Sequence, residues 1–371
     1  LAVELADIDD DGYDDLIYSA VQENATGSDL YNPDIYIHQS DSNGPSTEPY
    51  ADWSFDGGSN EIGYVWGIDA GDLNNDGDLD LLISATYASF FLFNDGTGGL
   101  DAFPETYSSS NTYTLKICQQ SVPVCHREIP VDAIVDMNKD GLNDVLWGNE
   151  ILLNEGSTDF GITNTFSELK EVEGDSLLVG DLTGNTVNDI VSITIGGPIA
   201  IFNHGGAILD NVVGSTLFSP GAPTQASNSV GTVVDINNDG KQDIITASVL
   251  NKVGIHLNDG TGAFSQNPQK TLTTSNYPSS IEVGDINGDG LKDIVVASGQ
   301  ALEIFWANST SFFNDTNMDT IEAPGGSYYS WYDSVLIDDI NDDGELEIAF
   351  EVVNNADTTT GNVARIIEYD K

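Results

Sequence analysis

Short apolar runs recur along the whole chain, each directly after a polar turn. Seven of them read DLIYSA, DLLISAT, DVLWG, DIVSIT, DIITAS, DIVVAS and EIAFEV, and another apolar run precedes each turn, as in SIEVGDI and SVLIDDI. A third run follows, as in FLFNDGTGG and GIHLNDGTG. Short runs that are rich in β-branched residues and bounded by Gly, Asn and Asp predict strands joined by hairpins, and no segment has sustained helical periodicity.

The turns share one frame, which we number by position. Asp285, Asn287 and Asp289 stand at positions 1, 3 and 5, Gly290 at position 6 and Asp293 at position 9. The other intact copies are Asp7-Asp9-Asp11-Gly12-Asp15, Asp72-Asn74-Asp76-Gly77-Asp80, Asp136-Asn138-Asp140-Gly141-Asp144, Asp235-Asn237-Asp239-Gly240-Asp243 and Asp339-Asn341-Asp343-Gly344-Glu347. A degraded copy runs Asp181-Thr183-Asn185 and ends on Asp189, with Thr186 in place of the glycine. We call these loops one to seven in chain order.

The residue types of this frame suit a calcium ion. Side chains at positions 1, 3, 5 and 9 offer oxygen atoms, with no Cys or His among them, and hard oxygen donors select calcium over zinc or copper. Position 7 can add its backbone carbonyl, from Tyr13, Asp78, Leu142, Lys241, Leu291 and Glu345. We therefore expect about six or seven calcium ions and leave loop four, which has only two carboxylates, undecided. The alternative is a set of acidic turns without metal.

The residue at position 2 argues against freely solvated turns. It is apolar in every copy: Ile8, Leu73, Met137, Leu182, Ile236, Ile286 and Ile340. An acidic turn in solvent has no need of such a residue, so we expect each loop to be anchored to a hydrophobic core.

The spacing of the loops predicts the fold. Successive first aspartates lie 45 to 65 residues apart, which is the length of a small four-stranded sheet with its turns. Seven such sheets predict one all-β domain, a seven-bladed β-propeller of four-stranded antiparallel blades, because closure into a ring protects the sheet edges. The expected blades span approximately 1–60, 61–126, 127–172, 173–226, 227–277, 278–330 and 331–371.

The combination of D-x-[DN]-x-[DN]-G-x-x-D, a following strand such as DIVVAS and LNDGTGAF at 257–264 resembles the FG-GAP and VCBS repeats of integrin α-subunit propellers and bacterial surface proteins. The resemblance implies strands A to D running from the hub outward, with calcium in the A–B turns. Three features depart from the pattern: loop four lacks its glycine, Glu347 replaces an aspartate, and no outer strand follows VARIIEYDK. We expect a three-stranded last blade or a closing segment outside this chain.

The charge and the two cysteines indicate which partners and which cellular location to expect. The formal charge is −51, from 61 acidic and 10 basic residues, and such a field repels phosphate backbones and anionic membranes. We expect no nucleic-acid partner and, without an apolar span, no membrane insertion. Loops of this type saturate at millimolar calcium, so we expect an extracellular or cell-surface location and a place in a larger protein. There Cys118 and Cys125 would form a disulfide, with two free thiols as the alternative.

Clustered aromatic residues mark the face opposite the loops as a candidate binding surface. They are Tyr64, Trp66, Tyr328, Tyr329, Trp331 and Tyr332, which precede strand A of the second and seventh blades. Aromatic rings there could stack on a glycan or anchor an extracellular protein, or they could pack between blades. We expect an adhesion or recognition module, with a structural module of a surface or filament protein as the alternative. A polysaccharide lyase is a weaker hypothesis, because only His126 with Arg127 could supply the base and the cation that lyase chemistry needs. We therefore expect no enzyme.

Overall fold

The computed structural model describes residues 2–21, 33–41, 44–46, 51–54, 65–85, 89–94, 112–115, 132–147, 150–154, 176–193, 199–202, 215–217, 228–248, 250–299, 301–310, 312–322, 335–341, 343–353 and 362–368. Every regular element in these ranges is a β-strand. Accordingly, the described part of the chain has no helix long and apolar enough to cross a membrane.

Consecutive strands form seven antiparallel sheets, which we call blades one to seven. Blade one contains β1 (Val3–Ala6), β2 (Asp15–Val21), β3 (Pro33–His38) and β6 (Ala51–Ser54), with the small hairpin β4 (Ser40–Asp41) and β5 (Gly44–Pro45) before β6. Blade two contains β7 (Val65–Gly71), β8 (Asp80–Ala85), β9 (Ser89–Leu92) and β10 (Thr112–Leu115). Blade three contains β11 (Asp132–Val135), β12 (Asp144–Trp147) and β13 (Glu150–Leu152). Blade four contains β14 (Ser176–Gly180), β15 (Asp189–Ile193), β16 (Ile199–Phe202) and β17 (Ser215–Leu217).

The second half of the chain continues the series. Blade five contains β18 (Asn228–Val234), β19 (Asp243–Ser248), β20 (Lys252–His256) and β21 (Lys270–Thr273). Blade six contains β22 (Pro278–Gly284), β23 (Asp293–Ser298), β24 (Ala301–Phe305) and β25 (Met318–Glu322). Blade seven contains β26 (Val335–Asp338), β27 (Glu347–Val353) and β28 (Asn362–Glu368). Among the described residues the last blade therefore has three strands, as expected.

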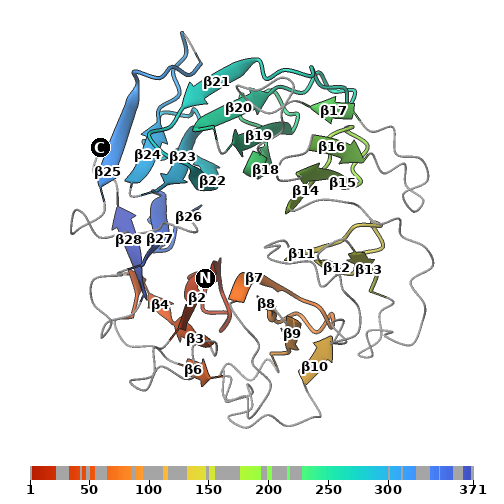
Figure 1. Cartoon of the computed structure of the whole chain (residues 1–371). Coiled ribbons are helices and arrows are strands. Elements are labelled where there is room, and N and C mark those ends of the chain that lie inside the picture. Colours follow the sequence, from red (N-terminus) through yellow and green to blue (C-terminus); the bar gives the residue numbers. More distant parts are fainter. Residues whose placement is uncertain are drawn as a thin grey trace, which may run out of the picture.

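The blades follow one another round a ring, with the first strand of each blade toward the centre (Figure 1). Inner strands of neighbouring blades contact one another, as β18 does with β22 and β22 with β26. The first and last blades also meet, because β1 contacts β26 and β2 contacts β28. The predicted β-propeller is confirmed, and its ring is closed by contact between the two ends of the described chain.

The core lies between the blades and explains why the second strand of a blade is apolar on both faces. In β23, Ile294 and Val296 pack in one cluster with blade-five residues, whereas Val295 and Ala297 pack in another cluster with blade-seven residues. Successive side chains of a strand point to opposite faces, so one strand serves two interfaces. All six residues of β23 are buried as a result.

The acidic frame forms the turn of the first hairpin in each blade. In blade six, Gly284 at the end of β22 pairs with Asp293 at the start of β23. The residue at position 2 then points into the core, since Ile286 is 2% exposed and its six counterparts are also buried. The expected anchoring of the loops is thus present in all seven copies.

Candidate metal centres in the hairpin loops

Each loop is wound around the carboxylate at position 1. In loop six, Asp285 accepts hydrogen bonds from the backbone N–H of Asp289 at 2.9 Å and of Gly290 at 2.8 Å. The equivalent pair of bonds occurs in the other six loops, on Asp7, Asp72, Asp136, Asp181, Asp235 and Asp339. The position 1 side chain therefore fixes the backbone of positions 5 and 6.

The glycine at position 6 is required by backbone conformation and not by space. Gly240 has φ +84°, and a Cβ placed on it would meet no atom within 4 Å. Residues with a side chain rarely adopt this left-handed conformation. Loop four nevertheless keeps it with a β-branched residue, Thr186, at φ +69°. The missing glycine therefore leaves the loop shape intact and introduces backbone strain.

Positions 3 and 5 fold inward through bonds to the loop backbone. In loop six, Asn287 Oδ1 accepts from the Asp289 N–H at 2.9 Å, and Asp289 Oδ1 accepts from the Leu291 N–H at 2.9 Å. The second bond uses the N–H of position 7 and leaves its carbonyl free to act as a ligand in the proposed site. The same bonding pattern recurs in loops two, three, five and seven.

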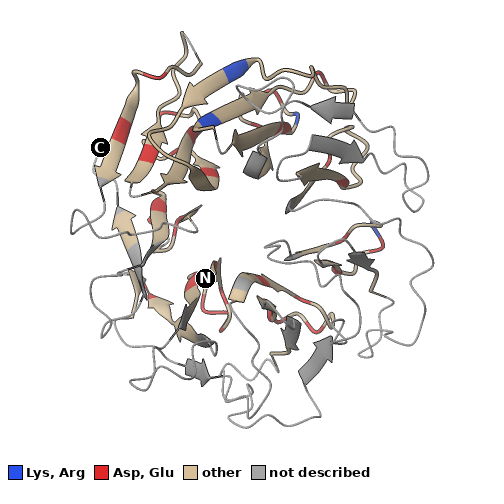
Figure 2. Cartoon of the chain, in the orientation of Figure 1, with Lys and Arg blue, Asp and Glu red and all other residues tan. Residues whose placement is uncertain are grey.

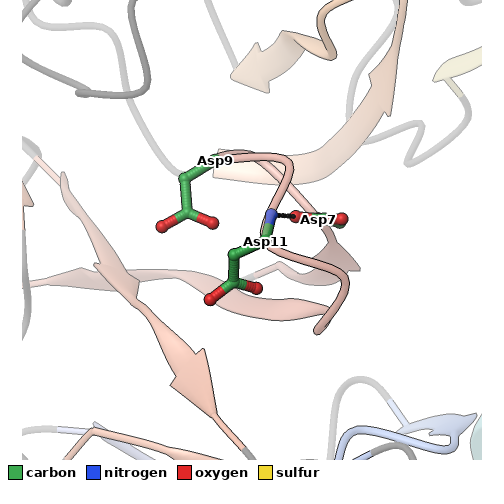
Figure 3. A group of neighbouring side chains, drawn as sticks. All are labelled: Asp7, Asp9 and Asp11. Atoms are coloured by element: carbon green, nitrogen blue, oxygen red, sulfur yellow. Dashed lines mark hydrogen bonds between the residues drawn. The ribbon is translucent and has the colours of Figure 1, made fainter.

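Loop one brings three carboxylates together. Oxygen atoms of Asp7, Asp9 and Asp11 lie within 4.8 Å of one another (Figure 3). Asp9 Oδ1 is buried and has no hydrogen-bond partner. In loop four the oxygen at position 3, Thr183 Oγ1, is likewise buried and unpaired. An unpaired buried oxygen is costly, so these atoms fit a hard cation, the species that an all-oxygen set selects.

The carboxylate at position 9 lies beneath the loop and ties it to the blade. Asp80 is fully buried; its Oδ2 accepts from the Leu73 N–H at 2.9 Å and its Oδ1 accepts from the Asn94 N–H at 2.8 Å. A carboxylate has about four acceptor sites, so these bonds are compatible with a ligand role. In loop seven the longer Glu347 makes the equivalent bond to the Ile340 N–H at 2.9 Å, and the replacement of aspartate therefore preserves the tie.

Burial opposes the negative charge of these carboxylates. Loss of solvation raises the pKa of Asp15 and Asp80 to about 7, and that of Asp144, Asp243 and Asp293 to about 6, against the hydrogen bonds from the backbone. Neighbouring loop aspartates, such as Asp76 beside Asp80, raise the pKa further. A bound cation would reverse this preference, because an adjacent positive charge favours the ionised form.

Most of the predicted binding-face residues lie outside the described part of the chain. This holds for Tyr64, Tyr328, Tyr329, Trp331 and Tyr332 and for the predicted disulfide between Cys118 and Cys125. Trp66 belongs to β7, but its side chain is not described.

The structure adds two exposed apolar residues on the same face, which sequence reasoning missed. Leu250 is 45% exposed in the β19–β20 turn, and Tyr277 is 56% exposed in the β21–β22 connection. Both segments lie at the strand ends opposite the acidic loops. Tyr277 could have been found from its place directly before strand A, which it shares with Tyr64.

The charge distribution follows the loops. Asp and Glu residues recur all round the ring, whereas Lys and Arg occupy few places among the described residues (Figure 2). The described histidines are not surface groups, since His38 and His256 are both buried.

Comparison with known proteins agrees with this architecture. Residues 235–296 and 285–350, which hold loops five to seven, match the FG-GAP-like repeat. The chain is therefore a β-propeller that carries FG-GAP-like repeats. No curated protein matches its sequence.

Solved structures share the fold at low sequence identity. BBS1N in complex with ARL6DN, soaked with lead, has a TM-score of 0.56 at 10% identity, covering 99% of this chain and 91% of that one. The mercury-soaked form of the complex has a TM-score of 0.52 at 10% identity, covering 95% and 87%. An Agrocybe aegerita lectin that recognises non-reducing terminal N-acetylglucosamine has a TM-score of 0.50 at 14% identity, covering 98% and 93%. At these identities the likeness concerns the fold.

Proposed function

We propose that this chain is an extracellular calcium-binding propeller that acts as an adhesion or recognition module. The observation that carries the calcium part is the convergence of Asp7, Asp9 and Asp11, with Asp9 Oδ1 buried and unpaired. The side chains at positions 1, 3, 5 and 9 and the carbonyl of position 7 would hold the ion. Bound calcium would supply positive charge that neutralises the clustered carboxylates and joins them.

The role of the chain's own residues is to hold these ligands ready. Position 1 orders the loop backbone, position 2 anchors it in the core, and position 9 ties it to the third strand. Because the ligands come from one hairpin and its supporting strand, calcium affinity contributes directly to the stability of the folded blade. Such loops fill where calcium is millimolar, which favours a location outside the cell.

The recognition part of the proposal concerns the opposite face. The acidic loops repeat one chemistry round the ring, whereas the connections on the other side differ from blade to blade, as binding loops do. Tyr277 and Leu250 are exposed there. An exposed aromatic ring suits stacking on a sugar, and the lectin with the same fold binds a terminal N-acetylglucosamine, so a glycan is the first ligand class to test.

The proposal assigns no catalytic role to the chain. Lyase chemistry needs an accessible base, and the described histidines, His38 and His256, are buried. The pair His126 and Arg127 lies outside the described residues. A structural module in a large surface protein is the second candidate. The same calcium loops support it, and this role requires no ligand on the opposite face.

Two measurements test the proposal. Calorimetric titration of chelator-treated protein should show binding of about six or seven calcium ions, and the absence of calcium uptake would overturn the metal assignment. A glycan array with calcium-loaded protein should give hits that Tyr277→Ala abolishes. Gln266→Ala is the control, because Gln266 is exposed in the β20–β21 connection, on the face of the acidic loops, and is not one of the proposed calcium ligands. An array without hits would favour the structural module.

A further inference from the structure

Three asparagines at the ends of third strands occupy the same place in their blades. Asn94, Asn154 and Asn258 follow β9, β13 and β20, and each is nearly fully buried. Their backbone N–H groups donate to the position 9 carboxylate of their own blade, at 2.8 Å to Asp80, 2.7 Å to Asp144 and 2.7 Å to Asp243. Any residue type could make this bond, because it uses only the backbone.

The side chains of these asparagines make a second bond that leaves the blade. Asn94 Nδ2 donates to the carbonyl of Ile8 at 2.8 Å, Asn154 Nδ2 to that of Leu73 at 2.8 Å, and Asn258 Nδ2 to that of Leu182 at 2.7 Å. Each acceptor is position 2 of the loop in the preceding blade. Each asparagine therefore touches two neighbouring loops at once.

The two bonds join one position 9 carboxylate to the next. Leu73 donates its N–H to Asp80 in its own loop and receives the Asn154 side chain on its carbonyl, while Asn154 donates its backbone N–H to Asp144. The same sequence of bonds runs from Asp15 through Ile8 and Asn94 to Asp80. Loops one, two and three thus form one connected series, and Asn258 joins loops four and five.

Among the described residues, the asparagine bridge is absent at two boundaries. In blade six the equivalent residue is Ala307, whose backbone N–H binds Asp293 at 2.8 Å but which has no side-chain donor for loop five. In blade one the equivalent residue is Ser40, which binds Asp15 at 2.8 Å through its backbone, while its buried Oγ has no hydrogen-bond partner. The chain itself therefore contains neighbouring loops with and without the asparagine bridge beneath them. Loops five and six, which lack it, are joined at their exposed ends instead, where Asn238 Nδ2 donates to the Gly290 carbonyl at 2.9 Å.

We propose that Asn94, Asn154 and Asn258 are positioning residues that couple calcium binding between neighbouring loops. The coupling rests on the proposed calcium function. A cation that fixes the position 9 carboxylate of one loop also fixes the asparagine amide bonded to it, and through that side chain the position 2 backbone of the preceding loop. The first ion therefore orders part of the neighbouring loop, and the second ion binds a loop that is already partly ordered. The second ion then loses less binding free energy to ordering, which gives positive cooperativity. The coupling through these asparagines joins loops one to three and loops four and five, whereas the boundary between loops seven and one lacks the asparagine bridge.

Native mass spectrometry during a calcium titration tests this inference. The wild-type protein should show fewer partially loaded species than independent sites would give, with a Hill coefficient above 1. Asn154→Ala and Asn258→Ala keep the backbone bond and remove the bridge, together with one side-chain bond inside the blade, from Asn154 Nδ2 to the Asn143 carbonyl at 3.1 Å or from Asn258 Nδ2 to the Gln242 carbonyl at 2.9 Å. They should lower the Hill coefficient toward 1 while the final number of ions stays the same. Asn317→Ala is the matched control, because its Nδ2 donates to the Trp306 carbonyl within blade six, at 3.1 Å; its titration should match the wild type.

Other results would separate a failure of the coupling from a failure of the calcium proposal. Independent filling of the wild-type sites, or unchanged cooperativity in both bridge variants, would overturn the coupling and leave the calcium proposal intact. Failure to bind any calcium would overturn both. If the variants do not fold, hydrogen exchange on the wild type decides. Protection in loops one to three should rise at one calcium concentration, whereas loops seven and one, whose boundary has Ser40 in place of an asparagine, should have separate midpoints. Coincident midpoints for loops seven and one with separate ones for loops one to three would refute the assignment.

Discussion

Asp69 on β7 accepts a hydrogen bond through its Oδ2 atom from the backbone N–H of Ile134 on β11, the innermost strand of the next blade. A carboxylate thereby pairs an N–H group at the inner edge of a neighbouring sheet. Burial raises the pKa of Asp69 to about 7 despite this bond, and it raises the pKa of Glu282 on β22 to about 7 as well. Burial also raises the pKa of Glu4, with further contributions from Asp69 and Glu282. The hub of the ring therefore holds carboxylates that resist ionisation.

Glu282→Gln should stabilise the protein at pH 8 and leave its stability unchanged near pH 4. The folded pKa of about 7 lies above the ordinary value, so the native state holds the proton between about pH 4.5 and 7, and stability is lost as the pH rises through that window. Removing the charge should gain roughly 1 to 3 kcal/mol at pH 8. Urea unfolding at both pH values measures this effect.

Asp259→Asn is the control for that experiment, since Asp259 is exposed and lies in a turn of blade five. It should change stability little at either pH. An equal gain at pH 4 and pH 8 in Glu282→Gln would show that charge burial is not the cause.

His256→Phe should remove a loss of stability on the acid side. Burial lowers the pKa of the His256 imidazole to about 4, although the nearby Ser265 backbone opposes part of the shift. The unfolded chain then binds more protons between about pH 6.5 and 4, so the contribution of this residue to stability is present above pH 6.5 and lost as the pH falls toward 4. The loss amounts to at most roughly 3 kcal/mol.

An apolar ring is the suitable replacement because blade six has Phe305 at the equivalent place in its third strand, opposite Ile294 as His256 is opposite Ile244. Thermal unfolding between pH 4 and 7 should show a smaller acid decline in the variant. Parallel curves for the variant and the wild type would contradict the assignment of this decline to His256.

Gly240→Ala should destabilise the protein by about 1 to 2 kcal/mol through backbone strain alone. The Cβ would meet no atom within 4 Å, so a clash is excluded, and the φ of +84° remains. Thr186→Gly makes the reverse change in loop four and should stabilise the protein, by less, because a glycine also increases the entropy of the unfolded chain. Chemical denaturation of both variants in chelator isolates the backbone effect from metal binding. A loss of stability in Thr186→Gly would mean that the side chain contributes more than its conformation costs.

The sequence predicts the loops and the ring well because their determinants are local. Asp285 accepts hydrogen bonds from residues four and five positions further along the chain, which close the loop. Ile286 at position 2 is apolar, and its residue type alone predicts that it is buried. Repetition of that frame then implies the sheets. Thr186, in place of the glycine, suggests from sequence that loop four has a different shape. The loop keeps the same shape, because the position 1 carboxylate still binds the backbone at this position.

The contacts between blades could not be predicted, because they join residues far apart in sequence. Asn94 binds the carbonyl of Ile8 across 86 positions, and an asparagine before a glycine-rich turn reads in sequence as an ordinary turn residue. The charge state of Glu282 likewise depends on burial at the hub, which strand periodicity does not reveal. The proposed binding face is formed by the connections opposite the acidic loops. Their composition differs between blades, so no repeated pattern predicts their structure.

The calcium loops should differ in affinity, with loop one tightest and loop four weakest. Loop one has four carboxylates, at Asp7, Asp9, Asp11 and Asp15, whereas loop four has only Asp181 and Asp189, and repulsion among carboxylates is relieved most where most of them converge. Asp11→Ala should therefore lower the melting temperature in calcium more than Asn185→Ala, the change at the same position of loop four. In chelator, Asp11→Ala should have a smaller effect, since occupancy at about 100 times the dissociation constant contributes ~2.7 kcal/mol for each site. Melting curves in calcium and in chelator separate the two contributions. If Asn185→Ala removes more calcium-dependent stability than Asp11→Ala, carboxylate number does not set the ranking, and the unpaired Thr183 Oγ1 becomes the first group in loop four to examine as a ligand.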